Sequence, residues 1–128
     1  MTEADSIRAV LARHPRIGLA VLFGSLAEGR ARPESDLDLA VQAANPLSAE
    51  EKMALIADLA VALGRPVDLV DLTQAGEPLL GQILKGRRLQ GSDEAHARLI
   101  TRHLMETADF LPLRERILQE RRTAWIGH

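Results

Sequence analysis

The chain of 128 residues contains no cysteine and no tyrosine, and its aromatic side chains are limited to two phenylalanines and one tryptophan. Without cysteine it can form no disulfide bond and perform no thiol chemistry, which suits a cytoplasmic protein. Without tyrosine, any reaction on a tyrosine hydroxyl must use another polypeptide. Since aromatic rings are so few, the core must be aliphatic, and 46% hydrophobic residues are enough to fill one.

The sequence also lacks long apolar segments and a strong charge of either sign. No apolar run approaches the roughly 20 residues that span a bilayer. The first six residues are largely polar and acidic, unlike a signal peptide. The net charge of −2 gives little support for nucleic-acid binding. We therefore expect a cytoplasmic protein that contacts neither a membrane nor nucleic acid directly.

The charge is distributed unevenly along the chain. Residues 75–128 contain nine basic and seven acidic residues, whereas residues 1–74 contain seven basic and eleven acidic ones. The basic C-terminal part can meet an acidic partner or a phosphate chain, or it can be the solvated surface of arginine-rich helices.

Hydrophobic periodicity predicts an alternation of helices and strands. The run 17–23 is continuously apolar, as in a strand buried on both faces, and Ser48 with Glu51 predicts a capping box at a helix start. We expect a single domain over residues 1–128 of the α/β (α+β) class, with a small mixed sheet flanked by helices and with C-terminal helices. The predicted strands cover residues 17–23, 36–42, 66–72 and 87–90, and the predicted helices cover 3–13, 25–29, 49–63, 77–85, 92–111 and 113–125.

Within the predicted helix 92–111, apolar residues recur on one side. We expect this stripe to pack against its own domain, with a partner protein as the alternative. The stripe consists of Ala97, Ile100, Leu104, Ala108 and Leu111.

The most informative feature is Gly24-Ser25, followed by a spacer of ten residues and then by Asp36-Leu37-Asp38. Gly24 ends an apolar strand and lets the backbone turn tightly, with no Cβ to keep a phosphate away. The unpaired N–H groups that open the next short helix favour an anion, and the Ser25 hydroxyl adds a donor. This turn is a predicted phosphate-binding site.

The two aspartates of the motif point to a metal. Asp36 and Asp38 are two residues apart on a predicted strand, so their side chains share one face, while Leu37 and Leu39 enter the core. Carboxylates this close repel each other, and a cation relieves the repulsion. Mg²⁺ prefers such hard oxygen ligands and keeps substrate phosphates in its shell.

A third carboxylate is expected from the third predicted strand. Asp68 and Asp71 are three residues apart and so face opposite ways. Asp68 is nearer the start of the strand and is our choice for the site, whereas Asp71, followed by Thr73, suits a capping role at the strand's end. Three carboxylates can hold two metal ions about 3.5–4 Å apart. Between the turn and the aspartates, Arg30 or Arg32 can reach a triphosphate, or can face the solvent.

The Gly24-Ser25 turn, the ten-residue spacer and Asp36-Leu37-Asp38 resemble the signature of the DNA polymerase β-like nucleotidyltransferase superfamily. The resemblance covers about residues 17–90, and the small size looks like the minimal nucleotidyltransferase (MNT) branch. It implies the nucleotidyltransferase fold, with Asp68 at the position of the family's third carboxylate. The resemblance does not extend to the C-terminal segment 92–128 and implies no role for it.

Members of this branch are typically encoded beside a HEPN-domain RNase toxin. The resemblance therefore implies an antitoxin that uses ATP and Mg²⁺ to attach AMP to a tyrosine of that toxin and so silences it. Because this chain has no tyrosine, the acceptor must belong to the partner.

Two other functions are compatible with the sequence. The first is a nucleotidyltransferase that acts on a small molecule such as an aminoglycoside. Such enzymes usually need a sizeable second domain, and the residues after Gly91 are few for one. The second is an antitoxin that acts by binding its toxin alone, although the full set of acidic residues argues against this function.

Overall fold

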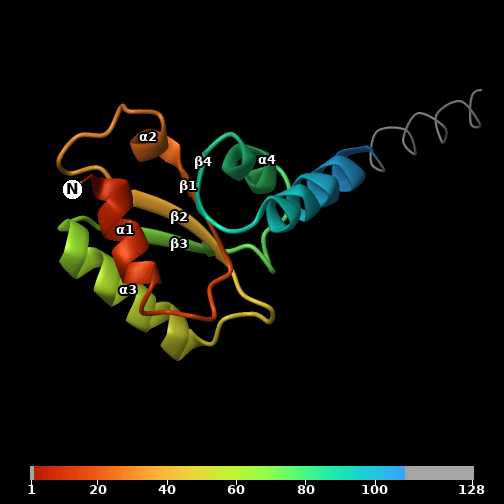
Figure 1. The fold of residues 1–128 in the computed structure, drawn as a ribbon. Coiled ribbons are helices and arrows are strands. Elements are labelled where there is room, and N and C mark those ends of the chain that lie inside the picture. The colour runs from red at the N-terminus through yellow and green to blue at the C-terminus, as the bar shows by residue number, and fades with distance from the viewer. Residues whose placement is uncertain (1, 109–128) are drawn as a thin grey trace, which may run out of the picture.

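The computed structural model of the protein describes residues 2–108, which form a four-stranded mixed sheet with helices on both faces (Figure 1). The strand order is β3-β2-β1-β4. Strand β1 pairs antiparallel with β2 and β4, and β2 pairs parallel with β3. The predicted fold class is therefore confirmed. The strands are β1 (Leu19–Phe23), β2 (Leu37–Gln42), β3 (Val67–Asp71) and β4 (Arg87–Gln90).

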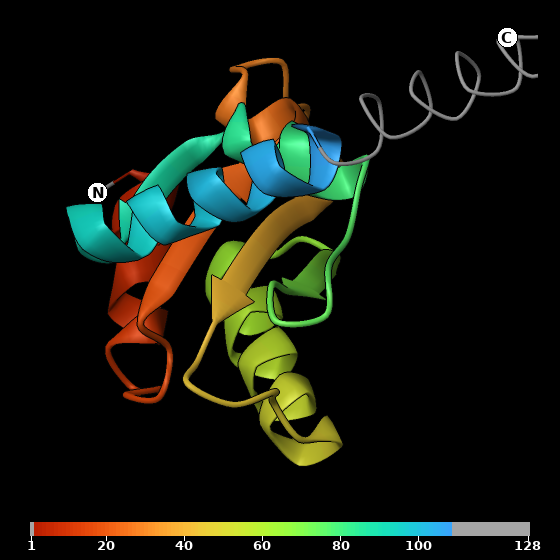
Figure 2. The ribbon, with the colours of Figure 1, turned by 90° about the vertical axis from the view of Figure 1, so that its right-hand side faces the viewer.

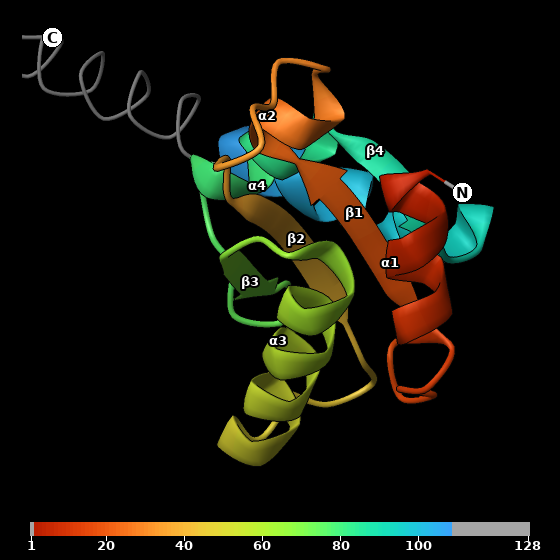
Figure 3. The same ribbon diagram turned by 90° about the vertical axis from the view of Figure 1, so that its left-hand side faces the viewer.

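Helices α1 and α3 cover one face of the sheet (Figure 3), and α4 covers the other together with the helix formed by residues 93–108, here called helix 93–108. Figure 2 shows helix 93–108 lying in front of the strands. The short α2 follows β1 directly. None of the helices in the described part of the chain is long and apolar enough to cross a membrane. The helices are α1 (Glu3–Leu11), α2 (Gly24–Ala27), α3 (Ala49–Leu63) and α4 (Leu79–Leu84).

Local sequence signals set the ends of the longer helices. The Thr2 hydroxyl accepts a hydrogen bond from the Asp5 amide and the Asp5 carboxylate accepts one from the Thr2 amide, which makes a capping box for α1. Ser48 and Glu51 form the predicted box for α3. Each box pairs backbone N–H groups that have no partner within the helix. Helix α3 ends at Gly64, whose φ of 64° suits glycine.

The sheet separates two apolar cores because side chains alternate along each strand. All five residues of β1 are buried, which confirms the prediction of a central strand covered on both faces. On β1, Ala20 and Leu22 face α1 and α3, and Leu19, Val21 and Phe23 face α4 and helix 93–108.

Within residues 2–108, the described part of the apolar stripe does not pack against the sheet or its helices, so the prediction that it packs on its own domain is wrong for these residues. Ile100 and Leu104 are exposed, whereas Leu99 is buried in the core. The helix therefore rests on the sheet through a neighbouring face, whose position depends on the loops that deliver the helix to the sheet. Leu111 and the predicted helix 113–125 lie outside the described residues.

Leu59 and Val61 of α3 provide a matched test of the core. Leu59 is fully buried, whereas Val61 is 87% exposed. Leu59→Ala should lower the free energy of unfolding by about 2–5 kcal/mol because it leaves a cavity. Val61→Ala should change it by less than about 0.5 kcal/mol. Urea unfolding followed by circular dichroism measures both, and equal losses would contradict this orientation of α3.

Candidate active site

The turn after β1 brings its glycine against a carboxylate of β2. Phe23, the last residue of β1, pairs with Asp38 in the antiparallel register, so Gly24 follows directly beside Asp38. Gly24 has a φ of 72°, and a Cβ placed on it would overlap a carboxylate oxygen of Asp38. Any other residue would be both strained and in collision at this position.

Asp38 and Asp68 lie opposite each other across the parallel strands β2 and β3. Leu37 and Leu39 are buried in the core beneath α1 and α3, so Asp38 belongs to the other face of the sheet. Asp36 immediately precedes β2 and is exposed, as is Asp68, while Asp38 is half-buried. The turn and the three aspartates therefore lie at one end of the sheet.

The surroundings of Asp38 raise the pKa of its carboxyl group. Partial burial raises the pKa of Asp38, and the negative charges of Asp68 and Asp36 and a hydrogen bond with Asp68 raise it further. Asp36 and Asp68 are therefore close enough to Asp38 for their charges to act on it. A cation bound among such like charges would favour their ionised forms.

The chemistry of these donors fits a divalent cation such as Mg²⁺, which binds carboxylate oxygens. Within residues 2–108, no three His, Asp or Glu side chains are gathered closely enough to form a complete metal site. Mutual repulsion opposes such gathering in the protein alone. A magnesium ion at this end of the sheet would complete its shell with water and substrate phosphate, as it usually does.

Asp71, the other acidic residue of β3, has a structural role. Its carboxylate accepts hydrogen bonds from the Leu47 amide (2.9 Å), the Thr73 amide (3.0 Å) and the Thr73 hydroxyl (2.7 Å). Burial alone would raise the pKa of Asp71, but the hydrogen bonds from Thr73 and Leu47, with the charge of Lys52, outweigh it and lower the pKa. Asp71 thus binds the chain segments at the end of β3, as expected of a capping residue.

Arg30, the predicted phosphate ligand, is paired with Glu28. The Nε atom of Arg30 lies 2.7 Å from Oε2 of Glu28, and both residues are exposed. An exposed pair of this kind contributes little stability. A phosphate can therefore replace Glu28 as the partner of Arg30 at small cost.

Arg65 contacts the loop that leads to Asp36, and sequence reasoning missed it. Only 11% of its side chain is exposed, and its guanidinium donates hydrogen bonds to backbone carbonyls of the loop 32–35. The same group pairs with Glu3 of α1. All these partners are 30 or more residues away along the chain, so no local pattern could have revealed them.

A buried strand, a glycine turn and two aspartates at the start of the next strand, on a mixed sheet, define a nucleotidyltransferase. The sequence profile of the family "Polymerase beta, Nucleotidyltransferase" matches residues 5–95. The chain belongs to this family, which confirms the resemblance carried by the motif.

Its relatives include the protein adenylyltransferase MntA of Shewanella oneidensis, 36% identical over 95 residues, which are 73% of this chain and 68% of MntA. A crystal structure of a toxin-antitoxin with AMP-PNP has a similar chain, with a TM-score of 0.77 at 29% identity over 91% of this chain and 96% of that one. A structure of a tri-AMPylated Shewanella oneidensis HEPN toxin in complex with MNT antitoxin also has a similar chain. The TM-score is 0.72 at 28% identity, over 92% of this chain and 94% of that one.

Gly24 and Gly29 are a matched pair for testing the turn, because their φ angles are 72° and 71°. A Cβ on Gly29 would meet no atom within 4 Å, whereas one on Gly24 would collide with Asp38. Gly29→Ala should therefore cost about 1–2 kcal/mol from backbone strain alone. Gly24→Ala should cost at least about 1 kcal/mol more, as overpacking does. Urea unfolding measures both, and equal costs would contradict the close approach.

Replacing Asp38 by Asn tests the electrostatics of the site. Because the folded pKa lies above the unfolded value of 3.8, Asp38 makes stability fall as pH rises from 3.8 through the folded pKa. Asp38→Asn should therefore raise the free energy of unfolding at neutral pH, by up to about 1 kcal/mol after solvent screening. The gain should vanish below pH 3.8. Thermal unfolding without divalent cations measures it, and a less stable variant at neutral pH would refute this account.

Proposed function

We propose that this protein is an antitoxin adenylyltransferase that transfers AMP from ATP to a tyrosine of a HEPN-type RNase toxin and so neutralises it. The observation that carries the proposal is the half-buried Asp38, whose pKa is raised beside Asp68 and Asp36, next to the Gly24 turn. The similarity to a protein adenylyltransferase, to a toxin-antitoxin with AMP-PNP and to a complex with a tri-AMPylated HEPN toxin supports the choice of nucleotide and acceptor.

The proposal divides the site into two parts. The carboxylates hold Mg²⁺, and the glycine turn with the arginine that follows it binds the triphosphate. When bound, one or two magnesium ions supply positive charge that offsets the triphosphate and lowers the pKa of the attacking hydroxyl. The proposed metal ligands are Asp36, Asp38 and Asp68, and the proposed nucleotide-binding residues are Gly24, Ser25 and Arg30.

The proposed reaction is an attack of the tyrosine hydroxyl on the α-phosphorus of ATP. A bond forms between the phenolic oxygen and this phosphorus. The bond from the phosphorus to the oxygen bridging to the β-phosphate breaks, and pyrophosphate leaves. The hydroxyl proton passes to a carboxylate oxygen, for which we assign the exposed Asp68. The acceptor belongs to another polypeptide, because this chain has no tyrosine.

Incubation with ATP, Mg²⁺ and a purified HEPN-type RNase toxin tests the proposal, and a HEPN-type protein from the same genome is the first choice of partner. The intact mass of the partner should rise by whole AMP units. Asp38→Asn and Asp68→Asn should each slow AMP transfer by at least about 100-fold, because even indirect partners of a metal typically contribute 10–100-fold. Removal of Mg²⁺ with EDTA should have the same effect. An undiminished rate in Asp38→Asn would refute the proposal.

Asp71→Asn is the matched control, because it removes a charge from the same strand as Asp68→Asn. It should lower the free energy of unfolding by about 1–3 kcal/mol through weakened hydrogen bonds and leave the rate per folded molecule unchanged. If Asp71→Asn abolishes AMP transfer and Asp68→Asn does not, then Asp71 is the third carboxylate of the site and Asp68 is not.

The same assays separate the competing functions. If the Asp36→Asn/Asp38→Asn double variant still neutralises the toxin in cells, neutralisation depends on binding alone. If AMP passes to an aminoglycoside and not to the protein partner, the protein is a small-molecule nucleotidyltransferase.

A further inference from the structure

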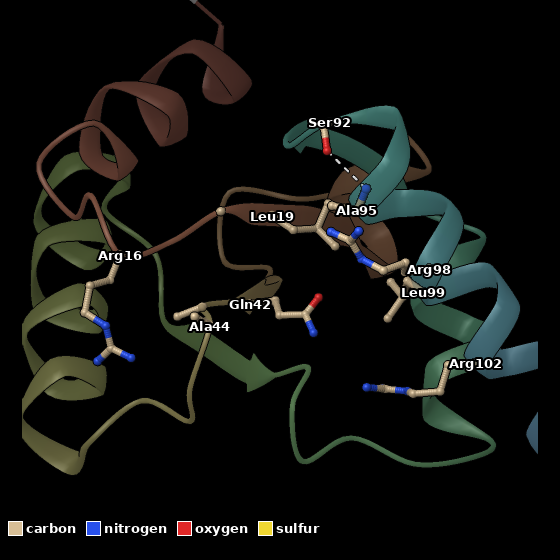
Figure 4. Close-up of a pocket in the computed structure, with 11 residues that line it drawn as sticks. Arg16, Leu19, Gln42, Ala44, Ser92, Ala95, Arg98, Leu99 and Arg102 are labelled. Carbon is tan, nitrogen blue, oxygen red and sulfur yellow. Dashed lines mark hydrogen bonds between the residues drawn. The ribbon is translucent and has the colours of Figure 1, made fainter.

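An open cleft of about 620 Å³ lies at the opposite end of β1 and β2 from the aspartates (Figure 4). Leu19 at the start of β1 and Gln42 at the end of β2 line it, and each is four residues, or roughly 13 Å, along its strand from Phe23 or Asp38. Helix 93–108 forms the facing wall. The cleft is therefore separate from the aspartates, and its volume is that of a small-molecule site.

Among the residues that the structure describes, the charged ones that line the cleft are Arg16, Arg98 and Arg102. Arg98 and Arg102 are four residues apart on a helix and are therefore neighbours on its surface. Figure 4 shows both side chains extending from the helix into the gap that Gln42 faces from the sheet. Like charges at this spacing repel, and a bound anion would relieve the repulsion.

Arg98 and Arg102 have hydrogen-bonding capacity that their protein partners do not use. Arg98 is 69% exposed, and its pair with Glu94 at 3.1 Å is of the weak surface type. Arg102 donates a hydrogen bond to the Ala75 carbonyl (3.1 Å), but its buried Nε has no hydrogen-bond partner among the described residues and lies 3.9 Å from a carboxylate oxygen of Glu106. No hydrogen bond within residues 2–108 uses the Nη1 atom of Arg102, so this end of the guanidinium is available to an acceptor in the cleft.

Arg16, the third arginine, adds positive charge to the cleft but is not placed to contact a ligand directly. The Arg16 guanidinium lies 2.6 Å from Glu51 and donates a further hydrogen bond to the Asn45 carbonyl. Figure 4 shows its side chain turned away from Arg98 and Arg102. A ligand would therefore be held mainly by the two arginines of helix 93–108.

The rest of the lining is largely apolar, and it restricts the kind of anion. Leu19 and Leu99 are buried residues that reach the cleft, and Ala43 and Ala44 add small apolar side chains. Such a lining favours an anion with an uncharged organic part. In the described part of the chain, no aromatic side chain lines the cleft, so it has no platform for stacking the bases of single-stranded nucleic acid.

We propose that this cleft is a second binding site for an organic phosphate of up to nucleotide size. Arg98 and Arg102 bind the phosphate, and the apolar wall contacts the organic part. A guanidinium presents two parallel N–H groups to two phosphate oxygens, which makes arginine well suited to this ligand. Binding here needs no metal and no acceptor protein, so the proposal stands or falls independently of AMP transfer at the aspartates.

Isothermal titration of the full-length protein with ATP, AMP and inorganic pyrophosphate in EDTA tests the proposal, because EDTA removes any metal-dependent binding at the aspartates. AMP and ATP should bind at one site per chain. Arg98→Gln should weaken binding at least about tenfold, which corresponds to about 1.4 kcal/mol for a lost charged contact. It should leave thermal unfolding and AMP transfer unchanged, since the side chain is exposed. Arg87→Gln, at an exposed arginine of β4 outside the cleft, is the matched control and should bind like the wild type.

Ala44→Asp is a second variant, because it adds a carboxylate to the wall at an exposed position. No binding of AMP or ATP at millimolar concentration would overturn the proposal, as would binding that neither variant weakens. Tighter binding of pyrophosphate than of AMP would show that the apolar wall contributes nothing. If a glutamate-rich peptide or single-stranded RNA binds more tightly than AMP and depends equally on Arg98, the cleft docks a macromolecule and the proposal is wrong.

Discussion

The antiparallel pairing of β1 with β2 is the interaction on which the site depends. It sets Phe23 opposite Asp38, so the glycine turn of one strand lies against the carboxylate of the other. The two apolar cores enforce this register from both faces of the sheet. A slip of one residue would turn Asp38 into the core beneath α1 and α3 and remove Leu37 and Leu39 from it, and burying an unpaired carboxylate is strongly unfavourable.

The two ends of these strands differ in electrostatic character. At the Gly24 end, burial and neighbouring acidic groups raise the pKa of Asp38, so the protein holds a charge there at some cost to its stability. Such a cost is common where selection acts on function. At the other end, the charged residues of the cleft within the described part of the chain are arginines. A phosphate-bearing ligand would need a cation to bind beside the aspartates, whereas it could bind directly to the arginines of the cleft.

The alternation of side chains along a strand was sufficient to separate Asp68 from Asp71. It allows only one of them to share the face of Asp38, and the structure pairs Asp68 with Asp38 while Asp71 binds neighbouring loops. The stripe on helix 93–108 shows where periodicity fails. Helical spacing reveals that Ile100 and Leu104 share a face, but the packing of Leu99 decides which face meets the sheet.

By itself the sequence determined the helices and strands found within residues 2–108 and the family to which the chain belongs. Capping boxes, apolar periodicity and the motif around Gly24 act over a few residues, so they can be read locally. Only the tertiary structure decided that Arg65 binds the loop before Asp36, and that a cleft opens between the start of β1 and helix 93–108. These features join residues thirty or more positions apart, and their free energy comes from packing and burial, which no local pattern specifies.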